Sequence, residues 1–176
     1  ALTFLMEDFS SSTAGALAFD TVYNFNGFTA SAAQNTTGVN NTGFEIFPAG
    51  HSGSQHAPFT TSQYLGWAED TPNKNGSGGY GATVTLNFAT QLNALAFNFL
   101  DSDRTDEYHL SINGVDIMSA FPSFGSSYDS AGFFGILDIS GISSVVFSAD
   151  STSPGGYVEE FGEVTAENSC KTNICK

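Results

Sequence analysis

Apolar and polar residues alternate with a period of two along most of the second half of the chain. Such alternation is typical of a β-strand with one buried face, because successive side chains point to opposite sides of the sheet. The predicted strands are 82–88, 92–100, 107–112, 115–118, 133–137, 143–149 and 157–165. The apolar residues predicted to form their buried faces are Leu86, Phe88, Leu95, Phe97, Phe99, Leu110, Ile112, Val145 and Phe147.

The connections between these segments favour antiparallel pairing. Asn113-Gly114 separates two of the predicted strands, and Asn-Gly is the strongest two-residue signal for a tight β-hairpin. Weaker strand patterns lie at 3–6, 21–25 and 28–31, whereas 33–81 is rich in Gly, Asn and Ser and is predicted to contain long ordered loops with short strands.

No segment combines a sustained helical period with capping residues. The chain is therefore predicted to be all-β, a two-sheet antiparallel β-sandwich of jelly-roll-like type. We expect residues 1–168 to form this single domain and residues 169–176 to form a C-terminal tail that carries a pair of cysteines.

Charge excludes one class of partner. The 176 residues include 18 Asp and Glu but only 4 Lys and Arg, which gives a formal net charge of −14. A nucleic-acid-binding protein needs basic side chains to neutralise phosphates, and this chain has almost none. No apolar run approaches the roughly 20 residues of a membrane-spanning helix, so we also expect no membrane insertion.

The two ends of the sequence indicate an exported protein. Ala1-Leu2-Thr3 is the kind of start left when a secretory signal is removed after a small residue. Cys170 and Cys175 are predicted to form a disulfide that closes a very small loop, worth about 2 kcal/mol in the chain-entropy model. The alternative is two unrelated surface thiols. An acidic, lysine-poor surface also fits a secreted, extracellular or cell-surface protein.

Three acidic residues crowd one predicted loop between strands. Asp101, Asp103 and Asp106 would repel one another unless a cation neutralised them, and Ca²⁺ takes several carboxylate oxygens. The Asp-x-Asp start is similar to an EF-hand loop, but the glycine at the sixth position and the closing glutamate are absent. The alternative is a solvated acidic turn with Arg104 as a partial counterion.

Several short motifs carry a family resemblance. They are Met6-Glu7-Asp8-Phe9, 16–25 and 27–32 at the start, 84–89, 92–99 and 101–103 in the middle, and 133–136, 142–147 and 160–164 at the end. Together they resemble secreted bacterial β-sandwich domains of exported proteins that carry a Pro-Glu-Pro C-terminal sorting signal, domains similar in plan to galactose-binding jelly rolls. The chain departs from that pattern because it has no Pro-Glu-Pro and ends in a cysteine pair.

The resemblance implies a second calcium site. Related carbohydrate-binding folds often hold a structural calcium where the first and last strands lie close together. Glu7 and Asp8 on the first strand and Glu160 on the last strand are the candidate ligands. Strict alternation would place Glu159 and Glu163 on the opposite face from Glu160, so these acids cannot all share one site. The alternative is ordinary surface carboxylates.

The stretch 56–70 holds the only tryptophan and mixes aromatic, amide and carboxylate side chains. Sugars stack on aromatic rings while amides and carboxylates bind their hydroxyls. The candidate ligand-binding residues on this basis are Tyr64, Trp67, Glu69, Asp70 and Tyr80. The alternative, which composition favours for Trp67, is that a single tryptophan fills the core of the sandwich.

Catalytic motifs are absent from the sequence. Neither a Gly-x-Ser-x-Gly elbow nor a His-Glu-x-x-His motif occurs, and both cysteines lie in the tail. Carboxylate pairs for glycoside hydrolysis could be chosen from Glu45, Glu69, Asp70 or Glu107, but among 18 acids such a choice is not evidence.

Three functions remain open. The favoured one is a secreted, non-catalytic, calcium-binding module that binds a polysaccharide or the extracellular matrix. The second is a structural subunit of a filament or surface layer, in which the apolar segment 2–6 adds to a neighbour's sheet by self-association. The third is a polysaccharide-active enzyme.

Overall fold

The computed structural model of the chain describes residues 4–34, 44–50, 62–68, 82–100, 108–118, 131–149 and 158–167. These residues form eleven strands without a helix, and every paired set of strands is antiparallel. A membrane-spanning helix is accordingly absent from the described ranges. The prediction of an all-β, antiparallel fold is confirmed.

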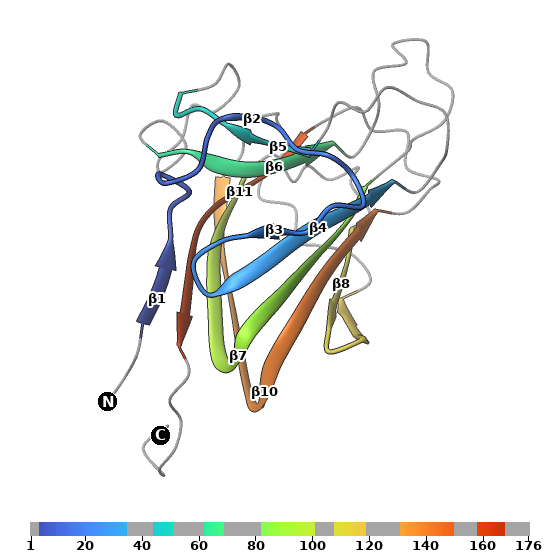
Figure 1. Ribbon diagram of the computed structural model, residues 1–176. Coiled ribbons are helices and arrows are strands. Elements are labelled where there is room, and N and C mark those ends of the chain that lie inside the picture. The colour runs from blue at the N-terminus through green and yellow to red at the C-terminus, as the bar shows by residue number, and fades with distance from the viewer. Residues whose placement is uncertain are drawn as a thin grey trace.

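Two long strands organise the molecule. β7 (Ala82–Leu100) and β10 (Ala131–Ala149) pair with each other along nearly their whole length, from Thr83 opposite Ser148 to Leu100 opposite Ala131. Both strands bend sharply near their middle, so that each looks like a V in Figure 1. The pairing is interrupted at the bend, where its register shifts between Leu137 and Ser144, and the two arms of each strand belong to two different layers of the sandwich.

The first layer is built on the C-terminal arm of β7 and the N-terminal arm of β10. Its hydrogen-bonded order is β2 (Gly15–Ala16), β5 (Phe44–Phe47), β6 (Tyr64–Ala68), β11 (Val158–Glu167), β7 and β10. β1 (Phe4–Glu7) also pairs with β11, beyond the part of β11 that pairs with β6. β2 and β5 therefore lie at one edge of this layer, and β10 lies at the other.

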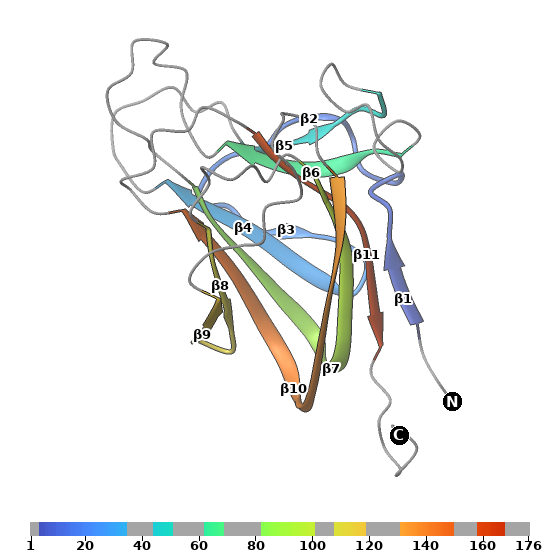
Figure 2. The same ribbon diagram turned by 180° about the vertical axis from the view of Figure 1, so that it is seen from behind.

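The second layer is built on the other two arms. Its order is β3 (Tyr23–Asn24), β4 (Phe28–Gln34), β7, β10, β8 (Tyr108–Ile112) and β9 (Val115–Met118). Figures 1 and 2 show β3 and β4 on one side of the V and the hairpin of β8 and β9 beyond the arm of β10.

The bend is made by a break in register. Leu137 pairs with Ala94, but the next paired residues are Ile142 with Leu92, so that β10 carries extra residues at the corner. Gly141 lies there with φ of +96°, a backbone conformation that side chains rarely adopt. A Cβ atom at this position would overlap the side chain of Gln91, whose amide donates a hydrogen bond to the Ser140 carbonyl at 3.0 Å.

The turn between β8 and β9 ties this corner to the second layer. The Asn113 amide nitrogen donates to the Gly141 carbonyl at 2.8 Å, and its oxygen accepts from the backbone nitrogens of Ser143 and Ser144 at 2.8 and 3.2 Å. Asn113 and Gly114 have φ of 52° and 79°, as a two-residue hairpin of type I′ requires. The predicted hairpin is confirmed, and its asparagine also binds the backbone of three residues at the bend.

One hydrophobic core joins the layers. It contains Phe44, Ile46, Leu65, Leu95 and Phe97 from the first layer and Val84, Leu86, Leu110, Val145 and Phe147 from the second. The rings of Phe97 and Phe147 meet edge to face, with centroids 5.6 Å apart. Two antiparallel layers that share one core form a β-sandwich, as the sequence predicts.

The predicted buried faces agree with this core. Leu86, Phe88, Leu95, Phe97, Leu110, Ile112, Val145 and Phe147 are buried. The side chain of Phe99 lies outside the described part of the structure. Strand boundaries were less well predicted, because 82–88 and 92–100 are one strand, as are 133–137 and 143–149. β5 and β6 are short strands within the region expected to be mostly loops.

The first strand pairs within its own chain. Phe4 lies opposite Glu167 and Glu7 lies opposite Val164, so the first and last strands are neighbours, as expected for the resemblance. In the alternative of a filament or surface-layer subunit, the segment 2–6 would add to a neighbour's sheet, and its residues from Phe4 onward pair with β11 of their own chain. Residues 169–176, with Cys170 and Cys175, lie outside the described residues.

The bend generates the first prediction. Gly141→Ala should lower the free energy of unfolding by about 2 kcal/mol or more, because alanine strains at positive φ and its Cβ has no room beside Gln91. The melting midpoint should fall by about 4–8 °C for a chain of this size. Gly135→Ala is the matched control, since the nearest atom to its Cβ would be a Phe133 ring carbon at 3.8 Å. Equal urea midpoints for both variants would contradict the account of the corner.

Candidate functional site

A pocket of about 560 Å³ opens between the edges of the two layers. Its lining residues are Glu7, Ser11, Ser12, Thr13, Leu17, Tyr23, Asn24, Phe25, Asn26 and Ile46. They come from the end of β1, the loop to β2, the segment after β2, β3 with the turn that follows, and β5. The pocket thus lies where β2 and β5 of the first layer face β3 of the second.

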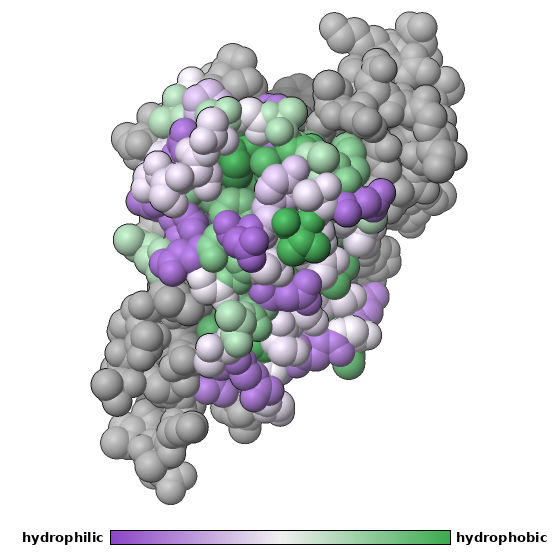
Figure 3. All heavy atoms as spheres, viewed as in Figure 1, coloured by the Kyte–Doolittle hydropathy of each residue, from purple (hydrophilic) through white to green (hydrophobic). Residues whose placement is uncertain are grey.

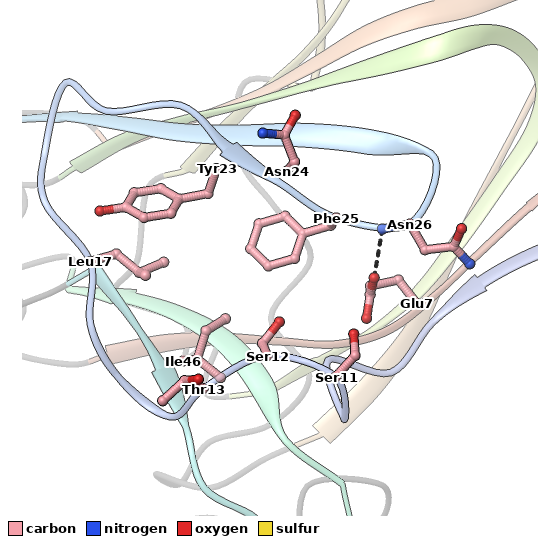
Figure 4. A pocket seen from close by; sticks show the side chains of 10 residues that line it. All are labelled: Glu7, Ser11, Ser12, Thr13, Leu17, Tyr23, Asn24, Phe25, Asn26 and Ile46. Carbon is pink, nitrogen blue, oxygen red and sulfur yellow. Dashed lines mark hydrogen bonds between the residues drawn. The ribbon is translucent and has the colours of Figure 1, made fainter.

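The pocket has an apolar interior and polar groups around it. Figure 4 shows the Phe25 ring pointing into the space between Leu17, Ile46 and the serine loop. Figure 3 shows hydrophobic residues gathered on the upper part of the same face, around β2, β3 and β5, with hydrophilic residues beside them. A ligand with both an apolar face and hydroxyl groups matches such a surface.

The aromatic side of the pocket is firmly packed. Phe25 stacks on Phe28 with ring centroids 5.4 Å apart, and Phe9 meets Phe25 edge to face at 5.2 Å. The Tyr23 ring meets the buried Phe44 at 6.0 Å, and its hydroxyl accepts a hydrogen bond from the Ala18 backbone nitrogen at 2.7 Å. These contacts fix the rings before any ligand arrives, which lowers the entropy cost of binding.

Glu7 holds the pocket together at its inner end. Its side chain is 5% exposed, and its carboxylate accepts hydrogen bonds from the backbone nitrogens of Phe9 at 2.6 Å and Asn26 at 2.7 Å. The Asn26 amide in turn donates to the Met6 carbonyl at 3.0 Å. Charge-assisted bonds of this kind are the strong ones, and here they join the first strand to the turn after β3.

The loop after β1 is held in an unusual conformation. Phe9 has φ of 57°, which for a bulky side chain costs about 1–3 kcal/mol of local strain. The strain is offset because the Phe9 ring is fully buried and its nitrogen binds Glu7. The Gln63 side chain, with its amide nitrogen toward the loop, donates to the Phe9 and Ser12 carbonyls at 2.6 and 2.9 Å.

Asp8 has a local role beside this loop. Its carboxylate accepts hydrogen bonds from the Ser10 hydroxyl at 2.6 Å and the Ser10 backbone nitrogen at 3.0 Å. The Ser10 hydrogen bonds lower the pKa of Asp8. A depressed carboxyl pKa adds stability above the pKa of the unfolded chain, and that stability is lost as the pH falls through the folded pKa. Because Asp8 is well solvated, the effect on stability is small.

The metal ligands expected on the first and last strands are not brought together as one set. Glu7 lies opposite Val164, whereas Glu160 lies opposite Leu100 and Gly66, four residues away along β11. The register of β11 on β7 shifts between Gly162 and Val164, so the alternation assumed for Glu159 and Glu163 is interrupted by a bulge. Among the described residues, there is no group of three or more acidic, histidine or cysteine side chains that could hold a metal ion.

The register instead associates Glu160 with the acidic loop. Its partner Leu100 directly precedes Asp101, the first acid of the 101–106 set. In the same way Val158 pairs with Ala68, which directly precedes Glu69. Asp101, Asp103 and Asp106 lie outside the described residues, as does the side chain of Glu160.

The proposed sugar platform is wrong for Tyr64. Its side chain is 0% exposed and its ring stacks on Phe47 with centroids 5.3 Å apart, so it is buried and not available to stack on a ligand. The physical reason is that Tyr64 lies directly opposite Phe47 on the neighbouring strand β5, on the face of β6 that does not carry the core residue Leu65. Glu69, Asp70, Tyr80 and the side chain of Trp67 lie outside the described residues.

Sequence reasoning missed most of the pocket. Tyr23 and Phe25 were assigned to a weak strand, and the serines at 10–12 carried no catalytic or binding pattern. Only Glu7 was singled out, and for a metal. A usable signal was Asn26-Gly27 with a phenylalanine on each side, Phe25 and Phe28, because Asn-Gly favours a tight turn that brings the two rings together.

Comparisons with known proteins identify a fold. No protein-family model matches the chain, and no curated protein is significantly similar to it in sequence. Among solved structures, the K1 cleaved adhesin domain of Lys-gingipain from Porphyromonas gingivalis W83 superposes with a TM-score of 0.56 at 13% identity, covering 95% of this chain and 99% of that one. This similarity establishes the β-sandwich fold.

Two further structures overlap less well. The catalytic unit of a thermostable GH87 α-1,3-glucanase from Streptomyces thermodiastaticus strain HF3-3 gives a TM-score of 0.43 at 14% identity, and this chain covers 28% of it. A second GH87 α-1,3-glucanase catalytic domain gives 0.37 at 12% identity, with 31% of that chain covered. Overlaps this poor support no argument about this chain.

The Glu7 contacts generate the second prediction. Glu7→Gln should lower the free energy of unfolding by about 2 kcal/mol, because the amide has only one acceptor oxygen and would turn its NH₂ group toward a backbone N–H. Asp8→Asn is the matched control, since an asparagine oxygen still accepts from Ser10 and the site is solvated. Urea unfolding at pH 7 distinguishes them, and a stable Glu7→Gln variant would contradict the anchoring role.

Proposed function

We propose that this chain is a non-catalytic binding module of an extracellular or cell-surface protein, and that it binds glycan or matrix components through the pocket between β2, β3 and β5. The observation that carries the proposal is the composition of that pocket. It combines a pre-packed aromatic side, formed by Tyr23 and Phe25, with the hydroxyl and amide groups of Ser11, Ser12 and Asn26.

The chemistry of saccharides fits these groups. One face of a pyranose ring consists of C–H groups and packs on an aromatic ring, while its hydroxyls exchange hydrogen bonds with serine hydroxyls and amides. The ligand proposed is therefore a neutral sugar unit of a polysaccharide. A strongly anionic one is disfavoured by the chain's net charge of −14.

The fold neighbour supports a binding role. The gingipain domain with the same fold is an adhesin domain, and it is matched over nearly its whole length. An exported chain with an acidic surface and a binding pocket is consistent with a module of that general kind.

The pocket does not favour catalysis. Glycoside hydrolysis requires two carboxyl groups on opposite sides of the scissile bond. Glu7 is the one carboxylate among the described residues that line the pocket, and both of its oxygens accept backbone hydrogen bonds. Its position fits a structural role in a binding site.

The third prediction tests the pocket. Ser11→Trp places a large side chain at the pocket and should weaken binding of its glycan by at least tenfold, or about 1.4 kcal/mol. Ala14→Trp is the matched control, because residue 14 is exposed in the same segment but does not line the pocket. A glycan array identifies the ligand, and titration calorimetry compares the two variants. Equal affinities would place binding elsewhere.

Calcium is proposed to bind at the end of the first layer. The candidate ligands are Asp101, Asp103, Asp106 and Glu160, with Glu7 and Asp8 as the separate strand-terminus candidates. The donor chemistry fits, since Ca²⁺ takes several carboxylate oxygens, and support comes from the register that pairs Glu160 with the residue before Asp101. There the ion would neutralise the mutual repulsion of the carboxylates.

The fourth prediction concerns calcium and stability. A hundredfold excess of Ca²⁺ over its Kd should stabilise the fold by about 2.7 kcal/mol, raising the melting midpoint by roughly 5–11 °C. Asp103→Asn should remove most of this gain, whereas Glu7→Gln should remove it only if the strand-terminus set binds the ion. Magnesium and monovalent salt at matched ionic strength control for screening. If metal-free and calcium-loaded proteins melt together, no calcium site exists.

A further inference from the structure

The N-terminal arm of β10 forms an edge of the first layer. Residues 131–137 pair with 94–100 of β7 on one side, and no described strand pairs with them on the other. Figure 2 shows this arm of β10 at the front of the view. An unpaired edge strand presents backbone donors and acceptors to any further strand that approaches it.

This edge is apolar and open. Phe133 is 68% exposed and Leu137 is 86% exposed, the two largest values among the exposed large hydrophobic residues of the described chain. Gly135 lies between them and is also exposed. Because glycine has no side chain, the exposed surface at this position is that of the backbone itself. Ile136 is buried, so Phe133, Gly135 and Leu137 share the outward face of the strand and Ile136 faces the core.

Antiparallel geometry restricts how such a strand can pair with a copy of itself. Residues directly opposite each other have the same hydrogen-bonding direction and the same face. A two-fold axis must therefore lie midway between the two copies of one residue. An axis level with the midpoint between two successive residues would place outward-facing positions opposite inward-facing ones. Among the central positions, an axis through Gly135 is the one that sets Phe133 of each copy opposite Leu137 of the other.

We propose that two copies of this chain associate through the 131–137 edge, antiparallel and centred on Gly135, to form one continuous sheet across a two-fold dimer. The interface is isologous, so a single operation satisfies both backbone edges and covers both exposed apolar residues of each chain. Two Phe133–Leu137 cross-strand pairs lie on the outer face, one on each side of the axis. This proposal does not depend on the glycan-binding function.

Charge favours the 131–137 edge of the first layer over the β9 edge of the second layer as the site of association. Residues 131–137 carry no charge, although the chain as a whole has a net charge of −14. In the proposed register the two Asp138 residues are six residues apart along the ladder, about 20 Å, which is beyond the Debye length at physiological salt. The β9 edge of the second layer is only four residues long, carries Asp116 and adjoins a register shift in its pairing with β8.

The first experiment measures association. Sedimentation velocity over a concentration series should show a monomer–dimer equilibrium that strengthens with added NaCl, because salt screens the repulsion between two acidic chains. Leu137→Lys should weaken dimerisation at least tenfold while leaving the urea midpoint unchanged at a concentration where both proteins are monomeric, since the side chain is exposed. Val115→Lys is the matched control, with the same charge change at an exposed position on β9. A monomer at every concentration, or equal effects of both variants, would overturn the proposal.

The second experiment tests the register. In a background where Cys170 and Cys175 are replaced by serine, Phe133→Cys and Leu137→Cys chains are mixed and oxidised. Opposed residues have Cα atoms about 4.5–5.5 Å apart, within disulfide range. Each variant is also oxidised alone, which gives three samples. In a dimer of one variant, such as Phe133→Cys, the two cysteines would be offset by four residues, or about 14 Å, and should not crosslink. A crosslink in the mixture alone supports the axis at Gly135, whereas equal crosslinking of all three samples would overturn it.

Discussion

The pairing of β7 with β10 in both layers is the constraint on which the rest of the molecule depends. Each strand contributes one arm to each layer, so the layers share their central pair and cannot shift independently. A corner of this kind needs extra residues and a backbone conformation open mainly to glycine, which Gly141 supplies. Gly141 and Ser143 have no partner in the ladder, and the Asn113 side chain, from a neighbouring hairpin, binds the backbone of both and of Ser144. The hairpin is therefore part of the corner.

At the pocket, a single carboxylate, that of Glu7, holds separate segments of the chain together. Glu7 ends the first strand and binds the backbone of both Phe9 and Asn26. Burying a charge without a cationic partner is costly, and two charge-assisted hydrogen bonds offset that cost. The same bonds hold Phe9 in a left-handed conformation that its side chain disfavours and place it in the core. The shape of the pocket is thus a consequence of how the chain secures its first strand, which is why the lining residues come from segments far apart in sequence.

Sequence patterning captured the fold because period-two alternation is local, and it identified the buried faces around Leu86, Phe97 and Val145 correctly. It divided β7 and β10 in two because the irregular residues at the corner look like a turn between separate strands. It could not find the pocket, since the partners of Glu7 are backbone nitrogens that every residue possesses. It placed Tyr64 in a ligand platform because aromatic composition alone does not tell an exposed ring from a buried one. Local pattern determines which face of a strand is buried, but long-range register determines which residues meet.

The two ends of the first layer have different surface chemistry, and the strand order keeps them apart. β2 and β5, which border the pocket, lie at one edge, and the uncharged arm of β10 lies at the other. A dimer formed through β10 would leave both pockets open and separated by the width of two sheets. For a repetitive ligand such as a polysaccharide, two weak sites held at a fixed distance act together, and the second binding step becomes intramolecular. The gain in avidity can reach about 10²–10⁴-fold without any new contact. A shallow pocket of about 560 Å³ on a single small domain is the kind of site for which such a gain matters most.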